Sequence, residues 1–321
     1  VYVATAPSPS WAGEDVLYYN TAGGTANYGP ETHIDKTGSE QRILIYQGTV
    51  NINSGAYVKV GGNTGPWCNF IGIDQTKPAA MNINGGTVWC ATSGGGAGIL
   101  GVGSSNKGIT STLTLNSGLL KVDTQLRSST AYNNLAGCTS SGTITINGGE
   151  AEVKQVVFGA SSSSTGTSTL TLQGGVLTVQ ELNFQPYNGQ VFSWRNGTLV
   201  AARANIFYIA EYKGSKSRTM EIFNTAVASF DTAGFAQSIP AFTGAGKLRL
   251  TGGGAVTFEQ AALTYGLILD GISLNLGALD ADAARLAVPN LEIIGPVTLD
   301  VTPPATPSGR YPLIASTAAI D

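Results

Sequence analysis

One phrase recurs six times along this chain and limits its fold more than any other feature. In each copy a short strand of alternating residues runs into a corner that closes with glycine, and a second short strand follows. The copies span residues 50–55, 81–86, 113–118, 144–149, 170–175 and 192–197. Their closing glycines are 31, 32, 31, 26 and 22 residues apart. A self-similar period of about 20 to 50 residues indicates a repeat architecture.

The composition supports many short strands and tight turns. Glycine accounts for 43 of the 321 residues, and only 12% are charged, against about 25% in typical globular proteins. Length alone would suggest two compact domains, but a repeat protein grows in one dimension. The net charge of −3 gives no basic surface for nucleic acid. We also expect no membrane-spanning segment, because no run of about 18 apolar residues occurs.

The alternation within each copy predicts which side chains face a core. In Leu113-Thr114-Leu115 the two leucines share one face, since successive strand residues point to opposite sides. A second strand, such as Leu120–Val122, and in several units a third, such as 156–159, follow the same rule. We predict an all-β, single-stranded right-handed parallel β-helix (β-solenoid) of about ten coils. The predicted core ladder is Ile52, Ile83, Leu115, Ile146, Leu172 and Trp194, and the predicted corner glycines are Gly55, Gly86, Gly118, Gly149, Gly175 and Gly197.

Three regions differ in how well they keep the phrase. Residues 1–42 lack it, and we expect them to form an N-terminal cap over an open strand edge. Residues 43–212 hold the regular repeats, and residues 213–321 hold degenerate coils, with an Ala-rich stretch at 279–286 that could form a short helix. Since the alternation runs nearly to residue 321, we expect the chain to be truncated within the repeats or to stack end to end with another copy.

The repeats resemble those of secreted passenger proteins. Residues 100–118 and 158–175 are similar to type V secretion and PEP-CTERM-associated repeats, with glycines ahead of a Thr-Leu-Thr-Leu strand and a closing glycine. Residues 230–252 resemble autotransporter-associated β-strand repeats. The resemblance implies export and an extracellular or bacterial cell-surface location, and it brings no catalytic residues.

The usual nucleophiles and metal ligands are scarce. His33 is the only histidine and lies outside the repeats, so we interpret it as an exposed loop residue. Cys68, Cys90 and Cys138 are an odd number of cysteines. Cys68 and Cys90 are about one repeat apart and could stack, but small buried apolar side chains are the favoured interpretation. We predict no metal and no cofactor.

One outward column is a candidate glycan-binding face. Trp89, Lys121, Glu152 and Thr178 each follow a corner glycine by three residues, and Lys59 joins them if its strand carries one extra residue. An exposed tryptophan beside hydrogen-bonding side chains suits a sugar ring, whereas an ordinary solvated face with one Lys–Glu pair is the simpler interpretation.

The carboxylates argue against an enzyme. A glycosidase needs two carboxyl groups held across a sugar, but Asp123, Glu152 and Glu181 follow their corner glycines by five, three and six residues. We therefore predict a secreted or cell-surface structural or adhesin-type protein without catalytic activity. The alternative is a β-helical carbohydrate-active protein, either a polysaccharide lyase or hydrolase or a glycan binder. The expected partners are glycans or a second copy of the chain.

Overall fold

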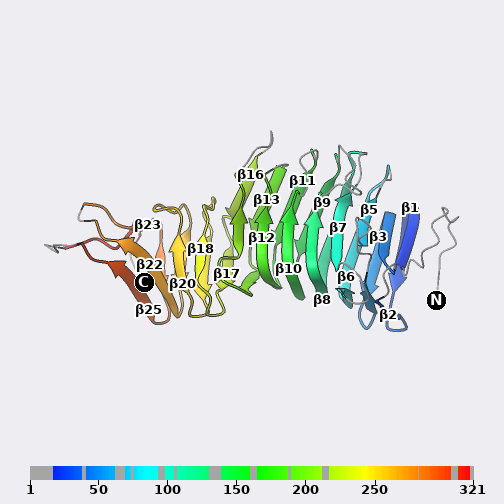
Figure 1. Ribbon diagram of the computed structural model, residues 1–321, viewed down its shortest axis with the longest axis horizontal. Helices are drawn as coiled ribbons and strands as arrows, with labels where there is room; N and C mark the ends of the chain where they lie inside the picture. Colours follow the sequence, from blue (N-terminus) through cyan, green and yellow to red (C-terminus); the bar gives the residue numbers. More distant parts are fainter. Residues whose placement is uncertain are drawn as a thin grey trace.

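The computed structural model describes residues 17–37, 41–61, 69–73, 76–92, 98–104, 107–129, 139–159, 165–186, 189–211, 217–280, 282–304 and 310–318. Within these ranges the protein is all-β, with 26 strands and no helix. The strands lie side by side along the long axis of the molecule, from β1 near one end to β25 near the other (Figure 1).

The strands of the first two thirds contain the six copies of the phrase. They are β1 (Leu17–Tyr28), β2 (His33–Lys36), β3 (Ile43–Asn53), β4 (Tyr57–Val60), β5 (Asn69–Ile73), β6 (Ala79–Cys90), β7 (Ile99–Ser104), β8 (Thr110–Ser128), β9 (Ser141–Ile146), β10 (Glu150–Phe158), β11 (Thr167–Leu172), β12 (Val176–Phe184), β13 (Gly189–Trp194), β14 (Thr198–Ala201) and β15 (Phe207–Ile209).

The remaining strands are shorter on average and carry the degenerate repeats. They are β16 (Arg218–Ile222), β17 (Val227–Asp231), β18 (Gln237–Ile239), β19 (Lys247–Thr251), β20 (Ala255–Phe258), β21 (Gly266–Leu269), β22 (Ile272–Ala278), β23 (Leu286–Val288), β24 (Leu291–Ile293), β25 (Val297–Thr302) and β26 (Ile314–Ser316).

Strands pair in parallel with their counterparts one repeat away. In the first stack, the strand before the glycine corner runs from β3 through β6, β8, β9, β11 and β13 to β16. In the second stack, the strand after the corner runs from β2 through β4, β6, β8, β10 and β12 to β14. A third stack runs from β1 through β3, β5, β7, β8, β10 and β12 to β15. The repeat period in the sequence is therefore the period of strand pairing.

The residues of the predicted core ladder lie inside, one above another. Ile83 pairs with Leu115, which pairs with Ile146, and all three are fully buried. Ile52, Leu172 and Trp194 extend the same line and are buried as well. All six belong to one cluster of buried apolar side chains, so the core is continuous from repeat to repeat. The indole N–H of Trp194 donates to the Gly197 carbonyl at 3.0 Å, so its polar atom is satisfied inside the core.

The glycine corners are of two physical kinds. At Gly55, Gly118, Gly149 and Gly175 the backbone is left-handed, with φ of 81°, 89°, 72° and 65°, a conformation that favours glycine. Gly86 and Gly197 depart from this, since neither has a positive φ and it is Gly85 that bends the second copy at φ 97°.

Space explains the remaining two glycines. A Cβ on Gly86 would lie 2.6 Å from the Asn53 carbonyl oxygen, and one on Gly197 would lie 2.5 Å from Cγ of Leu172. Gly118 also lies within the long strand β8, where the pairing with β6 shifts register, so its corner is a kink in a continuing strand.

The described part of the expected cap joins the stacks. β1 pairs in parallel with β3, and β2 pairs in parallel with β4, as the later strands do. The alternation is present here, but it uses Tyr19, Ala26 and Tyr28 in place of Leu or Ile, which hides it in the sequence. The described cap residues therefore form strands of the same parallel stacks, and residues 1–16 of the expected cap lie outside the described residues.

The strands of the last third still pair in parallel, but most of them divide between the large sheet and a separate four-stranded sheet. β17, β19, β21 and β24 pair in turn, and β18, β20, β22 and β25 form a separate sheet. The Ala-rich stretch at 279–286 has no helix among its described residues, where the Asp280 carboxylate instead accepts the Asp282 backbone N–H at 2.9 Å. This hydrogen bond precedes β23 in the chain.

Candidate binding surfaces

The predicted outward column exists as an aligned row in the second stack. Lys59 pairs with Trp89, and Trp89 pairs with Lys121. Lys121 pairs with Glu152, which pairs with Thr178. Strand pairing thus places these five side chains on one outward face, and Lys59 belongs to it.

The ring of Trp89 is already covered by its neighbours. The Lys59 ammonium lies 4.6 Å from the ring centroid and the Lys121 ammonium 5.3 Å from it, one from each neighbouring strand. The indole N–H donates to Asp123 at 2.9 Å. Cations at these distances are attracted to the ring face. A sugar could stack on Trp89 only after an ammonium group moved away, which makes the residue a poor open platform.

The charged members of the column form surface ion pairs. Lys121 and Glu152 are 2.7 Å apart, and Lys59 and Asp35 are 3.2 Å apart. The hydrogen bond that Lys121 donates to the Glu152 carboxylate raises the pKa of Lys121 above its ordinary value. Because all four side chains are partly exposed to water, each pair stabilises the fold by about 1 kcal/mol or less.

The other acids considered from the sequence are engaged with neighbours. Asp123 accepts the backbone N–H of Thr92 at 3.1 Å in addition to the Trp89 indole. Glu181 pairs with Arg203 and accepts amide hydrogen bonds from Gln155 and Asn183. These contacts give each carboxylate a structural partner.

The histidine and the described cysteine occupy structural positions. His33 is exposed but lies in strand β2, where its ring stacks on Tyr57 at 5.0 Å, so the loop interpretation is wrong in its secondary structure. Cys90 is buried at a core position between Val60 and Val122. Cys68 and Cys138 lie outside the described residues. Within the described ranges, no group of three or more His, Cys, Asp or Glu side chains could hold a metal ion.

A row of asparagines is a feature that the sequence reasoning missed. The Asn84 amide donates to Asn53 at 3.3 Å, Asn116 donates to Asn84 at 2.8 Å, and Asn147 donates to Asn116 at 2.8 Å. Each asparagine sits just before the corner of its repeat. Their shared position in the phrase was the available signal, and the row links four consecutive repeats by side-chain amides.

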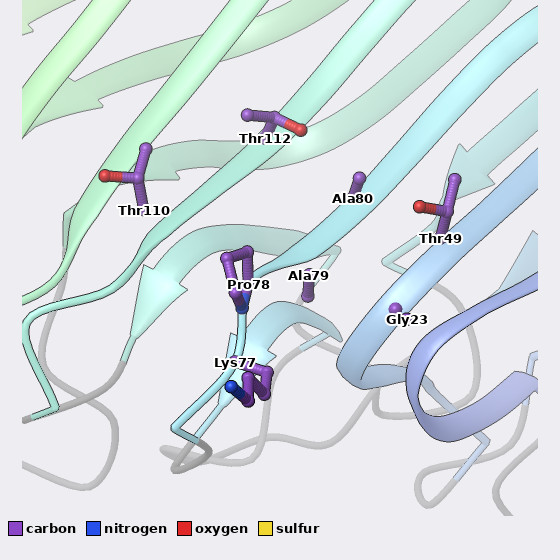
Figure 2. A pocket seen from close by; sticks show the side chains of 9 residues that line it. Gly23, Thr49, Lys77, Pro78, Ala79, Ala80, Thr110 and Thr112 are labelled. Carbon is purple, nitrogen blue, oxygen red and sulfur yellow. The ribbon is translucent and has the colours of Figure 1, made fainter.

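The outward face of the first stack carries a hollow of about 330 Å³ (Figure 2). Ala80 lies between Thr49 and Thr112 in one outward row, so a small side chain stands where both neighbours have a branched one. Lys77 and Pro78 precede β6 at one side of the hollow. The lining residues are Gly23, Gly48, Thr49, Lys77, Pro78, Ala79, Ala80, Thr110 and Thr112. The sequence signal was the alanine that interrupts the outward threonines.

Comparison with known proteins gives one informative similarity. The chain is 29% identical over 286 residues to the Adhesin BmaC autotransporter of Brucella suis biovar 1 (strain 1330). The match covers 86% of this chain and 8% of that protein, so the chain spans a small part of its relative's length. No family model matches the chain, and no solved structure gives a significant match. The described residues include no helix of the length and apolarity needed to cross a membrane.

Proposed function

We propose that this chain is a stretch of a secreted or cell-surface protein with an adhesin-type role. The observation that carries the proposal is the similarity to an autotransporter adhesin along 86% of the chain. The in-register repeats support it, because an extended stack displays outward side chains over a long surface.

For the architecture, we infer a right-handed parallel β-helix with one strand per side of each coil. Parallel pairing between residues 22 to 32 positions apart supports this, as in the line from Leu115 to Ile146 and Leu172. Parallel crossovers are right-handed in nearly all known cases, which supports the handedness.

A role without catalysis fits the contacts of the outward acids. Glu152 is paired with Lys121, and Asp123 holds Trp89 and Thr92. A general acid or base must be able to reach substrate. To do so, Glu152 would have to leave Lys121, and Asp123 would have to release the Trp89 indole and the Thr92 backbone N–H.

The test is adhesion by the purified chain. Beads coated with the folded chain should attach to cultured epithelial cells more than beads coated with the heat-unfolded chain at the same density. Attachment no greater than that of the unfolded control would contradict the adhesin role.

The same preparation tests the enzymatic alternative. A panel of neutral and acidic polysaccharides should give no unsaturated products by absorbance and no new reducing ends. Turnover that is lost in Glu152→Gln or Asp123→Asn would establish a carbohydrate-active enzyme instead.

A further inference from the structure

We propose that the hollow over Ala80 is a subsite for one anionic sugar ring of the uronic-acid class. This inference rests on the proposed adhesin role and names a ligand chemistry for it. It places recognition on the outward face of the first stack, away from the predicted column around Trp89.

The size of the hollow suits a single ring. Its volume of about 330 Å³ lies at the lower end of the range of about 300 to 1,000 Å³ that is typical of small-molecule sites.

The lining offers the groups that an acidic pyranose needs. Among the described residues that line the hollow, Lys77 is the only charged one, and it can pair with a carboxylate. Hydroxyl groups of Thr49, Thr110 and Thr112 can donate to and accept from sugar hydroxyls. Ala80 and Pro78 add apolar surface for the C–H face of the ring (Figure 2).

The backbone around the hollow is held in place before any ligand arrives. Gly48 has φ 85°, and a Cβ there would lie 2.3 Å from the Thr21 carbonyl oxygen. The Gly48 N–H donates to the Pro78 carbonyl at 3.0 Å, which joins two lining segments. Ala79 pairs with Gly48 and is buried beneath the surface. A site that is already fixed loses less conformational entropy when a ligand binds, so even a small ligand with few contacts can bind.

The hollow is also the more accessible of the two candidate surfaces. At Trp89 the ring is flanked by two ammonium groups and its N–H is already bonded. At Ala80 a ligand would meet short side chains and would displace none of the ion pairs of the described residues.

The experiment is saturation-transfer NMR and titration with methyl β-glucuronide, with methyl β-glucoside as the neutral probe of the same ring. Lys77→Met should weaken glucuronide binding about tenfold, which is the effect of losing one charge-assisted contact, and leave glucoside binding unchanged. Ala80→Leu should place a branched side chain in the middle of the hollow, where the ring would lie, and abolish binding of both probes. Thr169→Leu, in the same outward row, and Lys154→Met, an exposed lysine on β10, are the matched controls and should bind as the parent chain does.

Absence of glucuronide binding would overturn the inference, as would equal binding by Ala80→Leu or equal affinity for the two probes. The outcome is separable from the adhesin role. Beads carrying Ala80→Leu that still attach to cells, without any glucuronide binding by the parent chain, would refute the subsite and leave adhesion standing. Glucuronide binding by a chain that does not attach to cells would refute adhesion and leave the subsite standing.

Discussion

The early repeats and the last repeats follow the same alternation but differ in what covers their apolar side chains. In the early part Leu115 lies between Ile83 and Ile146 and is fully buried. In the last part Leu299 pairs with the buried Leu274 on one side and is 37% exposed. One sequence pattern therefore produces a core in one region and an exposed apolar surface in the other.

A neighbouring row repeats this difference. Leu250 pairs with Leu269 and both are fully buried, whereas Ile293, which pairs with Leu269, is 46% exposed. Burial in a stack comes from the paired strand on each side. An apolar residue in the last described row has only one such strand beside it, and its contribution to stability falls accordingly.

The largest expected effect is a charge placed in each of the two regions. Leu115→Asp should destabilise the fold by several kcal/mol, because a carboxylate would be buried without a partner. Leu299→Asp should cost about 1 kcal/mol or less, since water can reach the new charge. Urea unfolding followed by circular dichroism measures both losses. Equal losses of unfolding free energy in the two variants would show that Leu115 and Leu299 are not buried to different extents by their neighbouring strands.

The next effect compares two left-handed glycines. Gly118→Ala should cost about 3 kcal/mol, because its Cβ would lie 2.2 Å from the Gly86 carbonyl oxygen in addition to the strain of φ 89°. Gly234→Ala has a similar φ of 83° but open space around the Cβ, so it should cost about 1 kcal/mol. Thermal unfolding of the two variants separates the cost of steric contact from the cost of backbone strain. A larger loss of stability in Gly234→Ala than in Gly118→Ala would contradict the steric role given to the space around Gly118.

The smallest effect concerns the asparagine row of the early repeats. Asn116→Ala removes two side-chain hydrogen bonds and should cost about 1 kcal/mol. Asn147→Ala, also exposed, removes one of these bonds and should cost about 0.5 kcal/mol. Chemical denaturation with replicate titrations resolves the difference. No loss from either change would mean that the row adds nothing to the stability of the early coils.

The sequence was sufficient to predict what depends on periodicity. Alternation identified the side chains of the core ladder, and the shared offset placed Trp89, Lys121 and Glu152 in one outward row. The offset also predicted the Lys121–Glu152 pair. These features need only a constant repeat, because equal offsets in successive coils become neighbours when strands pair in register.

Periodicity gave less information about features that depend on which particular side chains meet, such as the surroundings of Trp89 and of the corner glycines. The sequence suggested an open Trp89, but two lysines from adjacent coils cover its ring. It suggested one kind of glycine corner. In the structure Gly118 is required because its backbone is left-handed, whereas Gly197 is required because a Cβ there would clash with its neighbours. The covering of Trp89 and the bend at each corner depend on side-chain directions and backbone angles. These involve atoms from three neighbouring strands at once.

The sequence by itself determined the repeat, its period and the inward face of each strand, since these follow from residue order and the alternation of a strand. Only the tertiary structure decided which inward residues are covered, where the backbone kinks within a strand, and that Ala80 opens a hollow between Thr49 and Thr112. The physical reason is that burial, steric space and cavities are properties of neighbouring strands in contact, and residues about 30 positions apart define each of them.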